Sequence, residues 1–245
     1  MKHRLVLLLG ATLLLAACTK RPVLPEFETR AVDTLLTGRS NACKVEYRFA
    51  SIRNAAKSPV LESIEQANIG YFFQLEAFNG TLDEAIPTTL DEIRTNYLDL
   101  EAGPSGGEYE ISVESEGTVV DSLVGYIITR AGYTGGAHGM YGTECHTYSL
   151  RDGFELSLSD LFSEQALARL DTLIREKIAA QYRASTDEEL VQAGFFPEYI
   201  APTENFQITD EGITFFYNPY DIGCYALGAV EVTLTTEELA QLRAL

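Results

Sequence analysis

The segment Tyr133-Thr134-Gly135-Gly136-Ala137-His138-Gly139 is a glycine-rich turn between two predicted β-strands, residues 118–131 and 144–150. Glycine adopts positive φ angles at little cost, so such a segment lets the chain reverse its direction. Another predicted strand, 108–116, precedes this pair, and the breaker cluster Gly103-Pro104-Ser105-Gly106-Gly107 comes before it. Consecutive strands joined by turns indicate an antiparallel sheet.

The residues before this sheet predict one strand and two helices. Residues 44–52 alternate charged with apolar side chains, as a half-buried strand does. Ser58-Pro59 predicts a helix start, because a capping side chain precedes proline at the first helical position. The inward face of this helix is expected to carry Leu61, Ile64, Asn68, Tyr71, Phe72 and Leu75. Pro87-Thr88-Thr89 is expected to begin the second helix.

The residues after the sheet predict a further set of elements. They comprise a short strand at 154–158, a helix at 161–183 capped by Ser159, a hairpin of 206–208 with 212–217, a strand at 229–234 and a terminal helix capped by Thr235 or Thr236. This order predicts an α+β fold of antiparallel sheets with helices packed on one side. We expect two small subdomains, residues 30–105 and 106–245.

The N-terminus predicts export and lipidation. Residues 1–17 combine a short basic region with an apolar run that ends in small residues before Cys18, as in a lipoprotein signal peptide. Cys18 is therefore expected to carry the lipid, with residues 18–29 as a tether. The alternative is an ordinary cleaved signal that leaves Cys18 as a thiol. We expect an outer-membrane lipoprotein that faces the periplasm.

The charge of the chain favours cationic partners. Residues 1–17 contain Lys2 and Arg4 and no acid, so the remainder has 16 basic and 36 acidic residues and a formal net charge of −20. A field of that sign repels nucleic acid and anionic membranes and attracts basic proteins. Excess acid that serves solubility alone is the alternative interpretation.

Motifs for catalysis or for metal binding are weak. Nothing matches a nucleophile elbow or a phosphate-binding loop. Cys145, His146, His138 and Cys224 could in principle hold zinc, but adjacent residues of a strand point to opposite faces, so Cys145 and His146 would not share one ion. We therefore expect no enzyme, no metal and no cofactor. Beyond Cys18 the chain has Cys43, Cys145 and Cys224, which allow either one disulfide and one thiol or three thiols.

The glycine-rich turn belongs to a wider pattern. Together with residues 153–162 and with Asn218-Pro219-Tyr220-Asp221-Ile222-Gly223-Cys224-Tyr225-Ala226-Leu227-Gly228, it resembles the extracytoplasmic domain of RsiV-type anti-sigma factors. A similar domain precedes the catalytic part of PdaC-type peptidoglycan deacetylases. The resemblance spans roughly the mature chain and is most specific over 126–235. It implies a module of the cell envelope for binding or sensing, and in the RsiV family this domain recognises lysozyme.

The resemblance also implies a set of site residues. The candidate partner-binding residues are Tyr133, Gly135, Gly136, His138, Tyr141, Tyr220, Asp221 and Tyr225. It further places Cys145 and Cys224 close enough for a disulfide. For His138 the alternative is a loop imidazole that bonds a backbone carbonyl. The predicted function is capture of a lysozyme-like, wall-active protein. The alternatives are a module that binds peptidoglycan glycans and, after it, an envelope enzyme that uses His138 with a carboxylate.

Overall fold

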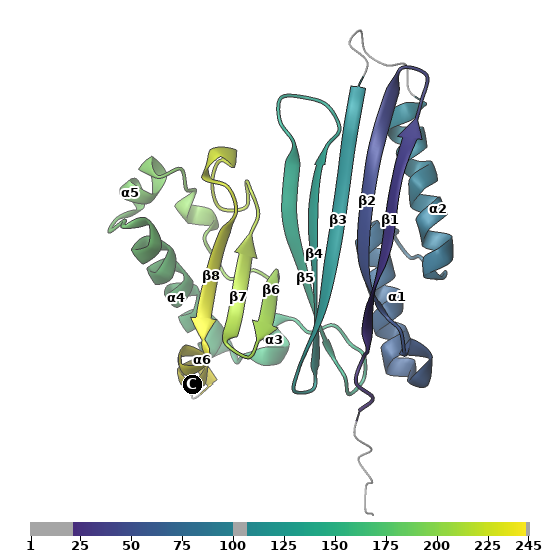
Figure 1. Cartoon of the computed structure of the whole chain (residues 1–245). Coiled ribbons are helices and arrows are strands. Elements are labelled where there is room, and N and C mark those ends of the chain that lie inside the picture. Colours follow the sequence, from purple (N-terminus) through teal and green to yellow (C-terminus); the bar gives the residue numbers. More distant parts are fainter. Residues whose placement is uncertain (1–21, 100–106, 244–245) are drawn as a thin grey trace, which may run out of the picture.

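The computed structural model describes residues 22–99 and 107–243 and has the predicted α+β architecture. Two β-sheets lie next to each other, and each carries helices on its outer side (Figure 1). The predicted signal peptide and Cys18 lie outside the described residues. Within those residues, no helix combines the length and the apolar character needed to cross a membrane.

The larger sheet has five strands in the order β1-β2-β3-β4-β5. They are β1 (Phe27–Thr37), β2 (Asn41–Ile52), β3 (Gly107–Val120), β4 (Leu123–Tyr133) and β5 (Met140–Ser149). β1 was not predicted, and it begins inside the expected tether. β3 runs through Gly117 to a turn at residues 121–122, so the expected strand break at that glycine is absent.

One pair departs from the expected antiparallel pairing. β2 and β3 run parallel, with Asn41 opposite Gly107 and Arg48 opposite Glu114. Parallel neighbours need a long crossover connection. That connection contains η1 (Ala55–Lys57), α1 (Pro59–Phe73), α2 (Leu82–Ile93) and η2 (Arg94–Leu98).

The two crossover helices begin for different reasons. α1 starts at Pro59, as predicted. α2 starts at Leu82, earlier than predicted, because Thr81 and Glu84 form a capping box in which Glu84 accepts a hydrogen bond from the Thr81 backbone. Pro87 therefore lies inside α2 instead of opening it.

The smaller sheet is antiparallel, in the order β6-β7-β8. The predicted hairpin is present as β6 (Phe206–Thr209) and β7 (Gly212–Tyr217), and β8 (Val230–Thr235) completes the sheet. The other elements of this half are α3 (Leu158–Leu161), α4 (Glu164–Tyr182), α5 (Asp187–Gln192), η3 (Pro197–Tyr199), η4 (Tyr225–Leu227) and α6 (Thr236–Arg243). Thr235 caps α6, as one of the two expected alternatives.

Two local predictions fail between the sheets. The expected strand 154–158 is a single bridge between Glu155 and Tyr148. α3 follows it directly, because Ser157 and Asp160 form a capping box. α4 is capped by Ser163 instead of Ser159.

The hydrophobic cores divide the chain at a different point from the one predicted. One core uses buried residues from Leu36 to Leu150 and the other from Leu158 to Leu242. The expected boundary at 105/106 lies outside the described residues and would divide β2 from β3, which are hydrogen-bonded neighbours in one sheet. The division between the cores lies between Leu150 and Leu158.

Two asparagine side chains join the sheets at the edge of β5. The Asn205 amide accepts a hydrogen bond from the Cys145 N–H and donates to the carbonyls of Thr143 and Phe216. Asn218 bonds both backbone groups of Thr143. These side chains occupy positions that a neighbouring strand would take, so the edge of β5 is covered without a further strand.

Candidate functional site

Two loops meet at Tyr225. We call residues 133–141 and 218–228 together the two-loop face. The Tyr225 hydroxyl donates a hydrogen bond of 2.8 Å to the carbonyl of Gly139, which lies 86 positions earlier in the chain. The His138 imidazole stacks on the Tyr225 ring, with 4.0 Å between centroids and 24° between planes. The structure thus brings the two predicted loops together through one side chain.

Other predicted residues surround this contact. The Tyr141 and Tyr220 rings lie 6.1 and 5.6 Å from the Tyr225 ring. Tyr133 donates from its hydroxyl to the Gly136 carbonyl and so braces the turn. Tyr133, Tyr141 and Tyr220 are 41%, 42% and 53% exposed. Large rings are therefore presented to solvent on a fixed frame, and tyrosine is enriched among the residues that dominate protein interfaces.

The remaining predicted residues shape the backbone of the face. Gly135 and Gly136 have φ angles of 100° and 97°, the conformation for which glycine is suited. Asp221 accepts a hydrogen bond from the Asn218 N–H and closes a turn. His138 Nδ1 lies 2.8 Å from the Gly139 carbonyl oxygen, and since a carbonyl only accepts, Nδ1 carries the proton. This contact is the loop-holding role considered as the alternative for His138.

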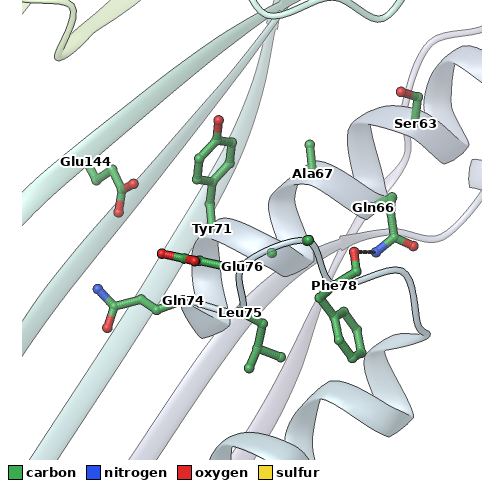
Figure 2. A pocket seen from close by; sticks show the side chains of 11 residues that line it. Ser63, Gln66, Ala67, Tyr71, Gln74, Leu75, Glu76, Phe78 and Glu144 are labelled. Atoms are coloured by element: carbon green, nitrogen blue, oxygen red, sulfur yellow. Dashed lines mark hydrogen bonds between the residues drawn. The ribbon is translucent and has the colours of Figure 1, made fainter.

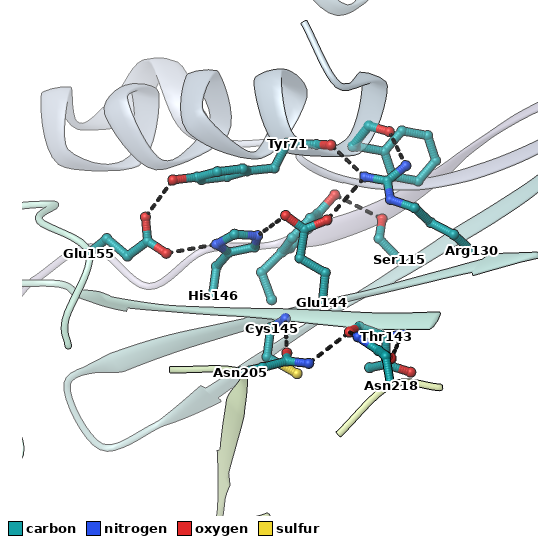
Figure 3. A network of polar contacts seen from close by, with 12 residues as sticks. Tyr71, Ser115, Arg130, Thr143, Glu144, Cys145, His146, Glu155, Asn205 and Asn218 are labelled. Atoms are coloured by element: carbon teal, nitrogen blue, oxygen red, sulfur yellow. Dashed lines mark hydrogen bonds and ion pairs between the residues drawn. The ribbon is translucent and has the colours of Figure 1, made fainter. Parts of the chain in front are cut away.

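A second cluster, which the sequence did not predict, lies between α1 and β5. We call it the polar chain: Tyr71, Glu155, His146, Glu144 and Arg130 (Figure 3). The Tyr71 hydroxyl donates to Glu155 at 2.8 Å, and His146 Nδ1 lies 2.7 Å from the other Glu155 oxygen. His146 Nε2 lies 3.2 Å from Glu144, which also pairs with Arg130 at 3.3 Å. The Tyr71 and His146 rings stack at 3.7 Å.

Arg130 connects the polar chain to the end of α1. Its guanidinium donates to the carbonyls of Phe72 and Tyr71 at 2.9 and 2.5 Å. The last carbonyls of a helix lack partners within the helix and carry partial negative charge, so a cation there is favourable. Arg130 therefore fixes the C-terminal end of α1 to β4.

The pKa values within the polar chain favour charged groups. Burial lowers the pKa of His146, but hydrogen bonds to Glu144 and Glu155 outweigh it, so the pKa is raised from its ordinary 6.5. Burial raises the pKa values of Glu144 and Glu155, yet bonds from His146 bring both below 4.5. At pH values below the raised pKa of His146, the cluster is an imidazolium held between two carboxylates.

Strand alternation explains why this cluster forms. Glu144 and His146 point from β5 toward α1, whereas Cys145 points to the opposite face, beside the smaller sheet (Figure 3). Tyr71 was expected in the core, but it is 37% exposed and reaches the polar chain. The period-two pattern of β5 was visible in the sequence. The approach of Tyr71 and Glu155, 84 positions apart, was not.

Three pockets adjoin one another beside these clusters. One, of about 640 Å³, lies along α1 and includes Gln74 and Glu144. The next, about 410 Å³, includes Gln74, Glu144 and Arg130. A pocket of about 350 Å³ includes Gln74, Arg130 and Tyr141. Because they share these lining residues, the pockets are neighbours between α1 and the two-loop face.

The predicted disulfide is not formed. Cys43, Cys145 and Cys224 are all free thiols. Cys145 is buried beside Asn205, while the Cys224 sulfur packs toward Gly194, where an added Cβ would lie only 3.0 Å away. The two thiols thus have separate surroundings. Among residues 22–99 and 107–243, no group of three or more histidine, cysteine or acidic side chains is arranged to hold a metal ion.

The chain is similar in sequence to one family over its smaller sheet and similar in fold to solved structures over most of its length. Residues 159–237 match a family described as "Protein of unknown function (DUF3298)". A crystal structure of a DUF3298 family member from Bacteroides fragilis is similar at a TM-score of 0.77 and 24% identity, covering 90% of this chain and 98% of that one. A DUF3298 family protein from Pseudomonas aeruginosa is similar at 0.60 and 18% identity, covering 89% and 94%. No curated protein matches the chain. At these identities the structural likenesses establish the fold alone.

Proposed function

We propose that this protein binds a basic, wall-active protein of the lysozyme type at the two-loop face, as a lipoprotein of the cell envelope. The observation that carries the proposal is the contact of Tyr225 with His138 and Gly139, which holds three exposed tyrosines in one place. Tyrosine rings fixed in this way lose little conformational entropy on binding. They are therefore suited to act as anchors in an interface.

The charge supports a basic partner. The full chain has a formal net charge of −18, which accelerates encounter with a cationic protein. Steering of this kind weakens with salt, whereas buried aromatic contacts persist. The two contributions can therefore be separated by measuring affinity over a salt series.

The placement of the face suits a lipid anchor at Cys18. Near the start of the described chain, Glu26 N–H donates to the Asn54 side chain, which in turn donates to the Leu24 carbonyl. Phe27 begins β1 at the end of the sheet opposite the turn after Tyr133 (Figure 1). Eleven residues of β4 span about 35 Å at 3.3 Å per residue. An anchored molecule would hold the two-loop face on the side away from its anchored end.

The proposal is tested by measuring how residues 19–245 bind a basic lysozyme. Tyr141→Ala and Tyr220→Ala should each weaken binding at physiological salt by about tenfold, as expected for an anchor worth about 1.4 kcal/mol. Phe154→Ala is the matched control, because Phe154 is 71% exposed and follows β5 at the opposite end of the sheet. The control should leave affinity unchanged.

Two results would reject the proposal. Binding that disappears with modest salt would mean attraction between opposite charges alone. Absence of binding at low salt, together with sedimentation of the protein on purified sacculi, would replace it with the glycan-binding alternative.

A further inference from the structure

The pocket of about 640 Å³ beside α1 lies outside the two-loop face. We call it the α1 groove: it runs along α1 and the segment that follows it, and Glu144 closes it on the side of the sheet (Figure 2). Its volume of about 640 Å³ is in the range of ligand pockets. Gln66 donates to the Phe78 carbonyl at 2.9 Å and holds the segment after α1 against the helix. The groove is therefore a feature of the folded backbone.

The floor of the α1 groove is open at Gly70. This glycine lies within α1, where glycine destabilises a helix relative to alanine. A Cβ added at Gly70 would meet its nearest neighbour, the Leu75 carbonyl oxygen, at 3.5 Å, which is ordinary contact. Neither space nor a positive φ angle requires glycine there. What the missing side chain provides is room in the groove.

The wall of the α1 groove offers one face of an aromatic ring. Tyr71 stacks on His146 with 18° between the ring planes, so one face of its ring is covered. Tyr71 lines the α1 groove and His146 lines the adjoining pocket, so the ring separates the two. The face of Tyr71 that His146 does not cover is available to a ligand. Cations, arginine above all, bind favourably over such a face.

The charged groups of the α1 groove are acidic. Among the described residues that line it there are Glu76 and Glu144 and no lysine, arginine or histidine. Glu144 already pairs with Arg130 and His146, whereas none of the ion pairs among the described residues involves Glu76. In the view of Figure 2, the Glu76 side chain lies between those of Tyr71 and Gln74. Carboxylate and amide oxygens accept hydrogen bonds from a guanidinium.

We propose that the α1 groove receives an arginine side chain of the basic partner, with the guanidinium over Tyr71 and paired with Glu76. This inference rests on the proposed function. Proximity supports it, because Gln74 lines both the groove and a neighbouring pocket that is also lined by Tyr141 of the two-loop face. A partner bound at the tyrosines thus lies within reach of the groove.

The groove is tested by itself with N-acetyl-L-arginine amide, followed by backbone amide chemical shifts of residues 19–245. The amides of Gly70, Gln74 and Glu76 should shift at millimolar probe. N-acetyl-L-citrulline amide, the neutral isostere, should bind about tenfold more weakly.

Gly70→Leu fills the floor of the groove and favours the helix, so it should abolish the shifts without lowering the melting temperature. Glu76→Gln should weaken binding, and Glu62→Gln, on the exposed surface of α1 outside the groove, should not. Equal shifts with citrulline, or none with arginine, would overturn the proposal.

Measuring lysozyme binding by the variants distinguishes a failure of the groove proposal from a failure of the proposed function. Gly70→Leu should weaken lysozyme binding by about tenfold. If Tyr220→Ala weakens that binding and Gly70→Leu does not, the groove proposal fails and the proposed function stands. If the unchanged protein binds no lysozyme, the proposed function fails and so does the identity of the partner, whatever the arginine probe shows at the groove.

Discussion

The side-chain amide of Asn218 bonds both backbone groups of Thr143, accepting from its N–H at 2.7 Å and donating to its carbonyl at 2.9 Å. The pairing reproduces the hydrogen bonds that a neighbouring strand would make. Asn218 begins one loop of the two-loop face, so the same contact that joins the sheets also positions the candidate site.

Asn218→Ala should destabilise the fold by about 2 kcal/mol, because the part-buried Thr143 N–H loses its partner and the Thr143 carbonyl keeps only the bond from Asn205. Asn218→Asp keeps the accepting oxygen and should cost less. Urea unfolding measures the difference. An Asn218→Ala variant as stable as the unchanged protein would show that the contact does not join the sheets energetically.

The polar chain predicts a pH window for stability. The raised pKa of His146 contributes stability at pH below its unfolded value of 6.5, and this is lost as pH rises through the folded pKa. The lowered pKa values of Glu144 and Glu155 contribute above 4.5 and are lost as pH falls through their folded pKa values. Both contributions are present together between about pH 4.5 and 6.5.

His146→Gln should therefore destabilise by about 2 kcal/mol within this window and by less outside it. Denaturant unfolding at several pH values measures the profile. His138→Gln is the matched control, since His138 is exposed and bonds a backbone carbonyl. A His146→Gln penalty that does not vary with pH would contradict the assignment of an imidazolium between two carboxylates.

Tyr225 should control the affinity of the two-loop face. Tyr225→Phe removes the bond to the Gly139 carbonyl and keeps the ring, so it should cost about 1 kcal/mol of stability and weaken lysozyme binding slightly. Tyr225→Ala also removes the ring on which His138 stacks and should weaken binding by at least about tenfold. Titration at physiological salt measures both. Unchanged affinity in Tyr225→Ala would remove Tyr225 from the site.

The thiols should differ in reactivity. Burial raises the pKa of the Cys43 thiol. Burial also raises the pKa of Cys145, to about 12, and the negative charges of Glu144 and Glu231 add to this effect. Cys224 is only half-buried. Native alkylation of residues 19–245 with iodoacetamide should thus label Cys224 first, with Cys43 and Cys145 following in urea. Mass spectrometry identifies the modified peptides. Resistance of both Cys145 and Cys224 in urea would indicate a disulfide.

Local signals explain the parts of the fold that the sequence predicted. The α1 start rests on Pro59 at the first helical position, since Ser58 is the N-cap residue but its side chain makes no capping hydrogen bond. The hairpin of β6 and β7 rests on alternation around a short turn. The α2 start shows where local signals compete, since Thr81 with Glu84 forms the capping box and Pro87 is tolerated within the helix. The first residues of β1, 27–29, were assigned to the tether and residues 30–37 to no element, because strand pairing was needed to recognise the strand.

Residue types and short spacings determined the α+β class, the glycine turn with positive φ at Gly135 and Gly136, and the residues of the two loops. These features depend on contacts within a few positions of the chain. Only the tertiary structure decided the parallel pairing of β2 with β3, the stacking of His138 on Tyr225 and the partners of His146. Each of these joins segments distant in sequence. Their geometry follows from how the sheets and helices pack, which local pattern does not encode.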